Sequence, residues 1–296
     1  MAGILTAATL ALASGAMAQL LNCAEVPQCP IPNTLSQCRV DGRLMTAIGV
    51  GNFSSAISQS PLTWTVTYSM ALDATAVDER RYYLGYPPEL DIQALPSVSS
   101  CALFFTGIEA GLSFVKDGDT RQKGPTPGTC DDALGTTCVA DLMKQAQGLA
   151  TSNQDCTTLA QMLQVAPPTS CTGAGNWGNI VAMPLNGSTP VQTTDCHPTS
   201  NSTYELASVA LFPELFPHDY FNDVTPLMTV FMPSANDTGD TVTSGLSVPE
   251  VHLNCMKPLN VVSNYQVVDS GTVPGTEIAM ALVFLMVGLQ GLSWLA

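Results

Sequence analysis

Ten cysteines are the residues of this chain whose type and spacing point most directly to chemistry. No two of them are spaced as C-x-x-C, the pattern of simple redox motifs and of most zinc knuckles. All lie within residues 19–270, and their even number predicts five structural disulfides. The cysteines are Cys23, Cys29, Cys38, Cys101, Cys130, Cys138, Cys156, Cys171, Cys196 and Cys255.

The disulfide pairing is open at the level of sequence. Short loops favour Cys130 with Cys138 and Cys156 with Cys171, but ten cysteines allow about 945 pairings. Each closed loop is expected to stabilise the fold by about 2 to 4 kcal/mol, because it restricts the unfolded chain. Disulfides persist in oxidising compartments, so the cysteines predict a secreted protein.

Residues for nucleophilic catalysis form no recognisable motif. The three histidines, His197, His218 and His252, stand in separate segments, and no G-x-S-x-G sequence is present. His252 alternates with Val251 and Leu253, which favours an outward-facing strand residue over a catalytic base. The chain has neither H-x-H nor H-E-x-x-H spacing, so no metal site is predicted.

Carboxylates offer the remaining route to catalysis, because glycan hydrolases use a pair of acids. Spacing does not select a pair, since the fold sets the required separation of roughly 5 to 10 Å. The tyrosines of residues 82–86 form the one local aromatic cluster and are interpreted as core residues at a strand end. The candidate acids are Glu89, Asp91, Glu109, Glu205, Glu214, Asp219 and Asp223.

Residues 173–178 spell G-x-G-x-x-G, the fingerprint of a dinucleotide-binding turn. That turn must join an apolar strand to a helix, whereas the sequence here follows Pro167-Pro168 and Cys171 and precedes no helical pattern. A glycine-rich disulfide loop is the better interpretation, and no cofactor is predicted. Residues 116–120 hold two aspartates but lack the later ligands of a calcium loop, which favours a solvated turn.

Apolar segments bracket the chain. Residues 1–18 carry no charge and end in Ala16-Met17-Ala18, which predicts a secretory signal peptide. Residues 278–296 are almost wholly apolar, and no lysine or arginine follows them. With small residues near Ser270 and a short polar spacer, this tail predicts a glycolipid (GPI) anchor signal over residues 271–296, attached at Ser270. A retained transmembrane helix is the alternative.

Four sequons, at Asn52, Asn186, Asn201 and Asn236, predict N-glycosylation in surface loops. The net charge of −15, without any basic cluster longer than Arg80-Arg81, excludes nucleic acid as a favoured partner. The expected partners are the membrane, through the lipid anchor, and cell-wall glycans.

Hydrophobic patterning predicts an α+β fold for the ectodomain of residues 19–270. Residues 64–70 alternate with period two, as in a half-buried strand, and further strands are expected over residues 44–50, 81–86, 101–105, 112–115, 227–232, 251–256 and 261–268. Residues 131–166 show helical spacing in two segments, the second with Ser152 as a plausible N-cap. The prediction is a mainly antiparallel, sandwich-like β-sheet ectodomain with a disulfide-stapled helical insertion, followed by an irregular loop over residues 169–203.

Five short segments resemble those of uncharacterised, cysteine-containing secreted proteins of filamentous fungi; they are residues 82–88, 101–105, 128–134, 229–233 and 253–255. The resemblance implies a fungal extracellular setting and provides no catalytic residue. The leading hypothesis is a cell-surface glycoprotein, GPI-anchored to the plasma membrane or transferred to the cell wall, with a structural or interaction role. The alternative is a secreted hydrolase of cell-wall polysaccharide that uses an Asp/Glu pair.

Overall fold

The computed structural model describes residues 38–45, 47–69, 78–95, 97–109, 112, 128–151, 155–174, 177–191, 198–199, 201, 203–214, 224–233 and 246–260. The chain divides into two units, Met1–Val262 and Ser263–Ala296, and every described residue belongs to the first. The predicted signal peptide, the anchor signal with Ser270, Asn236, Cys23, Cys29 and Cys196 lie outside the described residues, as does the side chain of Cys38.

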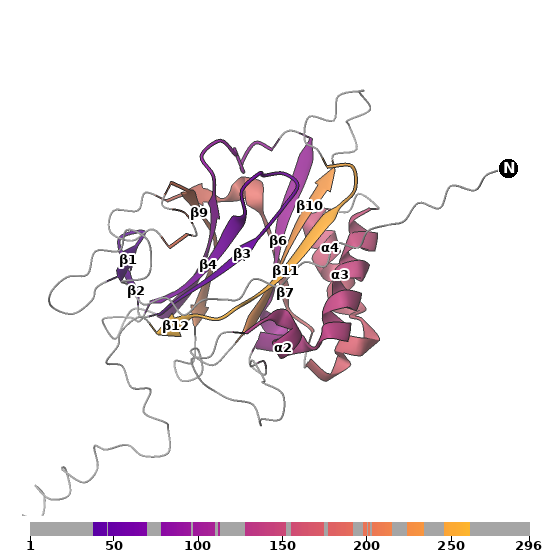
Figure 1. Cartoon of the computed structure of the whole chain (residues 1–296). Helices are drawn as coiled ribbons and strands as arrows, with labels where there is room; N and C mark the ends of the chain where they lie inside the picture. Colours follow the sequence, from indigo (N-terminus) through magenta and orange to yellow (C-terminus); the bar gives the residue numbers. More distant parts are fainter. Residues whose placement is uncertain are drawn as a thin grey trace, which may run out of the picture. The chain divides into compact units, whose positions relative to one another are not determined.

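Two antiparallel sheets and a small hairpin account for the strands of the described residues (Figure 1). The larger sheet has the order β12-β3-β4-β5-β9-β8, the smaller sheet has the order β11-β10-β6-β7, and β1 pairs with β2. The strands are β1 Cys38–Val40, β2 Arg43–Met45, β3 Ala47–Phe53, β4 Leu62–Ser69, β5 Asp78–Tyr86, β6 Val98–Phe105, β7 Ile180–Pro184, β8 Thr189–Pro190, β9 Glu205–Glu214, β10 Thr225–Pro233, β11 Glu250–Met256 and β12 Leu259–Asn260.

The smaller sheet is buried on both faces. Along β6, Leu103 and Phe105 face the helices, whereas Ala102 and Phe104 belong to the core shared with the larger sheet. A strand covered on both sides is mainly apolar: β6 is apolar from Cys101 to Phe105, and in β10 Thr229 is the one polar residue between Leu227 and Met232.

Aromatic side chains fill the core between the two sheets. Trp64 of β4 meets Phe104 of β6 edge-on, with ring centroids 6.2 Å apart. The indole N–H of Trp64 donates a hydrogen bond to the Thr229 hydroxyl of β10 over 2.8 Å. The buried indole is therefore satisfied by the facing sheet, which fixes how the two sheets meet.

Helices cover the other face of the smaller sheet, and α3 and α4 pack against each other (Figure 1). Thr129 and Asp132 form a capping box at the start of α2, and Asp155 caps α4 in place of the predicted Ser152, which lies outside the described residues. The helical insertion and the α+β fold class are thus confirmed. The helices are α1 Thr106–Glu109, α2 Cys130–Leu134, α3 Thr136–Ala150 and α4 Cys156–Val165, with 3₁₀ turns η1 Thr169–Ala174 and η2 Leu185–Gly187. None of the helices in the described ranges has the length and hydropathy to span a bilayer.

Strand β4 differs from the prediction, because all eight of its residues are buried. Its threonine face lies under Pro198 and Thr199: the Thr65 hydroxyl donates to the carbonyl of Pro198, and a Cβ added at Gly85 would lie 2.6 Å from Thr199 Cγ2. The half-buried interpretation was wrong because a neighbouring segment of the chain replaces solvent on that face.

The predicted irregular loop over residues 169–203 is also wrong in part. It contains η1, the strands β7 and β8, and the segment that covers β4. Leu112, expected to begin a strand, lies outside any strand, and residues 113–115 and 261–268 are not described.

Candidate functional site

Three disulfides are present among the described residues, and none of the described cysteines is free. They join Cys101 of β6 to Cys156 of α4, Cys130 of α2 to Cys255 of β11, and Cys138 of α3 to Cys171 of η1. The presence of disulfides is confirmed.

The two pairings favoured by short loops are wrong. Cys130 and Cys138 lie at the starts of two helices that face different elements, β11 and η1. Cys156 begins α4 beside the centre of the smaller sheet, away from Cys171. The helical insertion is therefore stapled to the sheet by two bridges rather than closed on itself.

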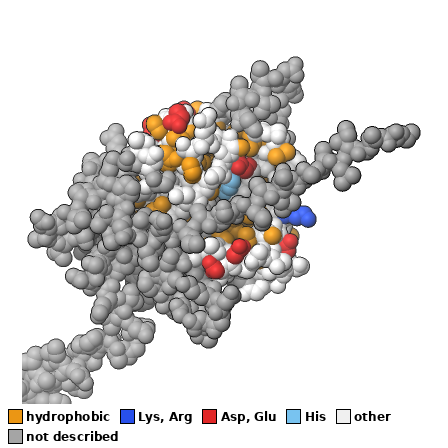
Figure 2. All heavy atoms as spheres, in the orientation of Figure 1, with side chains coloured by type: hydrophobic (Ala, Val, Ile, Leu, Met, Phe, Trp, Pro, Cys, Tyr) orange, Lys and Arg blue, Asp and Glu red, His pale blue; other side chains and the backbone are white. Residues whose placement is uncertain are grey.

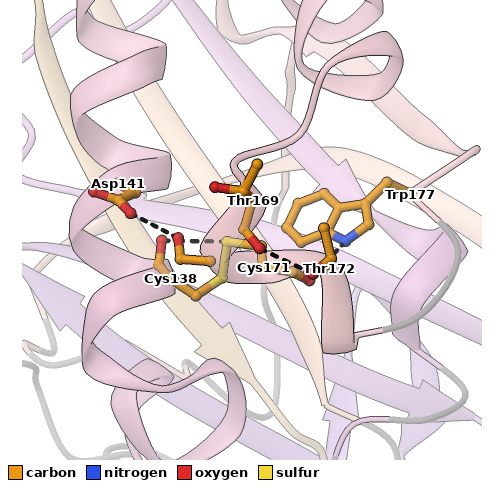
Figure 3. Close-up of a disulfide and its surroundings, with 7 residues drawn as sticks. Cys138, Asp141, Thr169, Cys171, Thr172 and Trp177 are labelled. Atoms are coloured by element: carbon orange, nitrogen blue, oxygen red, sulfur yellow. Dashed lines mark hydrogen bonds between the residues drawn. A yellow bond between two sulfur atoms is a disulfide. The ribbon is translucent and has the colours of Figure 1, made fainter.

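Figure 3 shows the surroundings of the third disulfide, Cys138–Cys171. The indole N–H of Trp177 donates to the carbonyl of Cys171 over 3.3 Å, and the Ser170 hydroxyl donates to Asp141 over 2.7 Å. Cys138 and Cys171 are only 2% and 1% exposed. A bridge so enclosed is out of reach of a reductant, which indicates a structural role.

The glycine-rich sequence beside this disulfide has no phosphate-binding context. Gly173 and Ala174 end η1, and the next element is the strand β7. A dinucleotide site needs the amino terminus of a helix after the glycines, where backbone N–H groups meet the pyrophosphate. The local structure therefore agrees with a disulfide loop.

Serine, histidine and carboxylate side chains meet at one end of the sandwich. Glu250 of β11 accepts hydrogen bonds from the Ser55 hydroxyl over 2.7 Å and from the Ala56 N–H over 3.0 Å. Its other oxygen lies 2.9 Å from Nε2 of His252. The His252 ring packs against Phe53 of β3, with centroids 4.9 Å apart. The cluster ties the β3–β4 connection to β11.

The position of His252 corrects the sequence interpretation. Val251 and Leu253 face the helices, so His252 between them points to the opposite face of β11. That face packs against β3 of the larger sheet and not against solvent. The imidazole is consequently only 12% exposed. His197 and His218 lie outside the described residues.

Glu250 stays ionised at this position. Burial raises the pKa of its carboxyl, but the interactions with His252, Ser55 and the Ala56 N–H together outweigh burial and leave the pKa below its usual value. In a Ser-His-acid triad the imidazole lies between the hydroxyl and the carboxylate and removes the proton of the serine. Here the carboxylate lies between the hydroxyl and the imidazole, so the triad order is absent, and Glu250 links the β3–β4 connection to β11. We call this arrangement the Glu250 clasp.

Two candidate acids affect the pKa of one tyrosine. Tyr86 of β5 pairs with Glu205 of β9, and its pKa is raised to about 12, first by burial, then by the charge and hydrogen bond of Glu205 and finally by the charge of Asp91. Both carboxylates are exposed, as is Glu89. Glu109 and Glu214 lie in described elements without described side chains, and Asp219 and Asp223 are not described.

Tyr82 and Tyr86 belong to the core between the sheets, as predicted, whereas Tyr83 is buried but lies outside that core. Acidic side chains are dispersed over the face in Figure 2 rather than gathered in one place. Within the described ranges, no three His, Cys, Asp or Glu side chains are grouped so as to hold a metal ion.

The sequons occupy different environments. Asn186 in η2 and Asn201 before β9 are exposed, whereas Asn52 is half-buried within β3 and not in the loop that was expected.

Comparison of the chain with family models, curated proteins and solved structures gave no match. The fungal resemblance therefore stays a prediction.

Proposed function

We propose that this chain is an extracellular cell-surface glycoprotein with a structural or interaction role, held at the surface by a C-terminal lipid anchor. The observation that carries the proposal is the set of three disulfides that connect α2, α3 and α4 to their neighbours. Such bridges form in the oxidising compartments of the secretory route. The charge-free leader and the apolar tail of the sequence support the same address.

The described chemistry favours a role other than catalysis. Glu250 accepts hydrogen bonds from Ser55 and from the Ala56 N–H and lies beside His252, an arrangement that connects the two sheets and lacks the hydroxyl–imidazole–carboxylate order of a triad. The expected partners are the membrane, through the lipid anchor, and cell-wall glycans.

The test of the proposal is release from the cell surface. Phosphatidylinositol-specific phospholipase should free the protein from membranes, and no mature peptide should extend beyond about Thr272. Truncation after Thr276 should turn the cell-bound protein into a soluble secreted one, because it removes the apolar stretch. A tag placed after Ala296 serves as the control and should be absent from the mature protein. A lipase-resistant protein that retains Trp294 contradicts the proposal.

One observation favours the hydrolase alternative as a second candidate: in addition to burial, the charges of Glu205 and Asp91 both raise the pKa of Tyr86. If these carboxylates form the acid pair, the double variant Asp91→Asn/Glu205→Gln should abolish hydrolysis of cell-wall polysaccharide by the secreted protein. Glu89→Gln changes an exposed acid nearby and is the matched control. Equal turnover by the double variant and the wild type, or none by either, rules this pair out.

A further inference from the structure

We infer that Asn186 and Asn201 carry N-glycans, that Asn52 carries none, and that the two glycans stand at opposite ends of the β8–β9 edge of the larger sheet. The inference rests on the proposed secretory address, because glycans are added only on that route. It assigns the sugars to particular sites from the burial and hydrogen bonds of three described sequons.

Asn201 is built to display a glycan. Its side chain is exposed, and its Oδ1 accepts hydrogen bonds from the N–H and the hydroxyl of Thr203, both over 3.1 Å. This Asx turn uses only the oxygen of the amide. The nitrogen, to which a glycan is joined, remains available, and the turn survives after a sugar replaces one of its hydrogens.

Asn186 is held outward by the segment around it. The N–H of Ser188 donates to the carbonyl of Leu185 over 3.1 Å, and the Gln93 side chain donates to the carbonyl of Ser188 over 2.7 Å. Leu185 and Ser188 are buried, whereas Asn186 between them is exposed. The 3₁₀ turn η2 therefore anchors its neighbours and leaves the asparagine in solvent.

Asn52 is directed into the fold instead. It lies opposite Thr63 of β4, and its Oδ1 accepts a hydrogen bond from the Thr63 hydroxyl over 2.9 Å. Thr63 is fully buried on the face that Pro198 and Thr199 cover. A glycan is too bulky for a packed interior, so a sugar on Asn52 would have to displace this cover.

The positions of the two glycans have a common consequence. Strand β8 is the edge of the larger sheet; it pairs antiparallel with β9 through Thr189 and Pro190, and the next N–H, of Val191, donates to the carbonyl of Leu206 over 2.8 Å. Asn186 precedes β8 and Asn201 precedes β9, so they lie at opposite ends of this antiparallel pair. Exposed sheet edges recruit strands from other chains, and bulky hydrophilic groups at both ends oppose such pairing.

The experiment maps the occupied sites of the full chain secreted from a eukaryotic host. Glycans are removed enzymatically in ¹⁸O-labelled water, which marks each formerly occupied asparagine as labelled aspartate, and peptides are read by mass spectrometry. Label is expected at Asn186 and Asn201 and not at Asn52. Label at Asn52, or its absence from Asn186 or Asn201, overturns the inference.

Variants provide a second measurement on the intact protein. Asn186→Gln and Asn201→Gln should each lower the mass by one glycan, whereas Ser54→Ala, which destroys the Asn52 sequon at an exposed residue, should leave it unchanged. A glycan lost from Ser54→Ala contradicts the inference alone. A chain that stays inside the cell without sugar at any sequon contradicts the proposed address as well.

Discussion

Removal of the Cys130–Cys255 disulfide is expected to be more destabilising than removal of Cys138–Cys171. The first bridge spans 125 residues of sequence and the second spans 33. Loop-closure entropy of the unfolded chain grows with the logarithm of this length, which gives about 4.9 kcal/mol for the longer loop and about 3.7 kcal/mol for the shorter one. When Cys138–Cys171 is intact, it shortens the loop that Cys130–Cys255 closes to about 90 residues. The stabilisation expected from Cys130–Cys255 then falls only to about 4.6 kcal/mol.

The double variants Cys130→Ala/Cys255→Ala and Cys138→Ala/Cys171→Ala form a matched pair. Each exchanges two buried sulfurs for hydrogen, since all four cysteines are at most 8% exposed. The cost of the lost packing is therefore similar, and the difference between the variants reports loop length. We expect a difference of about 1 kcal/mol in the free energy of unfolding.

Equilibrium unfolding in urea, followed by far-ultraviolet circular dichroism, measures both variants against the wild type. A loss of about 4 to 5 kcal/mol is a large part of the total stability of a single domain, so the Cys130–Cys255 variant should also be secreted poorly. The reasoning is refuted if the Cys138→Ala/Cys171→Ala variant loses as much free energy of unfolding as the Cys130→Ala/Cys255→Ala variant, or more.

Three further predictions concern the thiols, the Glu250 clasp and one glycine. Alkylation of the secreted protein under denaturing, non-reducing conditions should label no cysteine; two or more labelled thiols per molecule would contradict the disulfide prediction. The pKa of the Glu250 carboxyl is lowered in the fold. Its contribution to the free energy of unfolding is therefore fully present at pH values above the ordinary pKa of 4.5 and is lost as the pH falls through the folded pKa. Glu250→Gln should therefore lower the free energy of unfolding by about 1 to 3 kcal/mol at pH 7 and by less in acid, and a deficit constant from pH 7 to 3 would refute this. Gly49→Ala should cost about 2 kcal/mol or more in thermal and urea unfolding, because its Cβ would lie 2.1 Å from the carbonyl oxygen of Lys257. Gly148→Ala in α3, with open space around it, is the control and should be neutral or stabilising; equal effects would argue against the close approach.

Elements with an intact hydrophobic period could be predicted from the sequence. The buried stripe of α3 includes Leu142 and Ala146, one turn apart, and β6 and β10 are rich in apolar residues. Strand β9 escaped prediction, because a bulge between its pairs with Tyr82 and Tyr83 leaves Val209 without an opposite residue on β5. One extra residue reverses the alternation of side chains halfway along the strand, and the period of two disappears.

Contacts between distant parts of the chain could not be predicted. Ser55 and Glu250 are 195 residues apart, and no local pattern indicates that they meet. The disulfide partners follow the same rule, because which sulfur faces Cys130 depends on how α2 packs against β11 and not on the length of the loop. The cover over β4 likewise depends on where Pro198 and Thr199 lie, and no regular sequence pattern marks them.

The place of Cys255 determines how this fold responds to mechanical force. If the protein is tethered through its C-terminal end, a pull from the surface first reaches β12, which holds β3 through only two residues. Once β12 has peeled away, the pull can extend the chain by only the five residues 256–260, about 17 Å, before it arrives at Cys255. There the covalent bond to Cys130 divides the load between β11 and α2. The disulfide would then act as a mechanical stop: β12 detaches under load, while the two sheets that the Cys130–Cys255 bond protects stay folded.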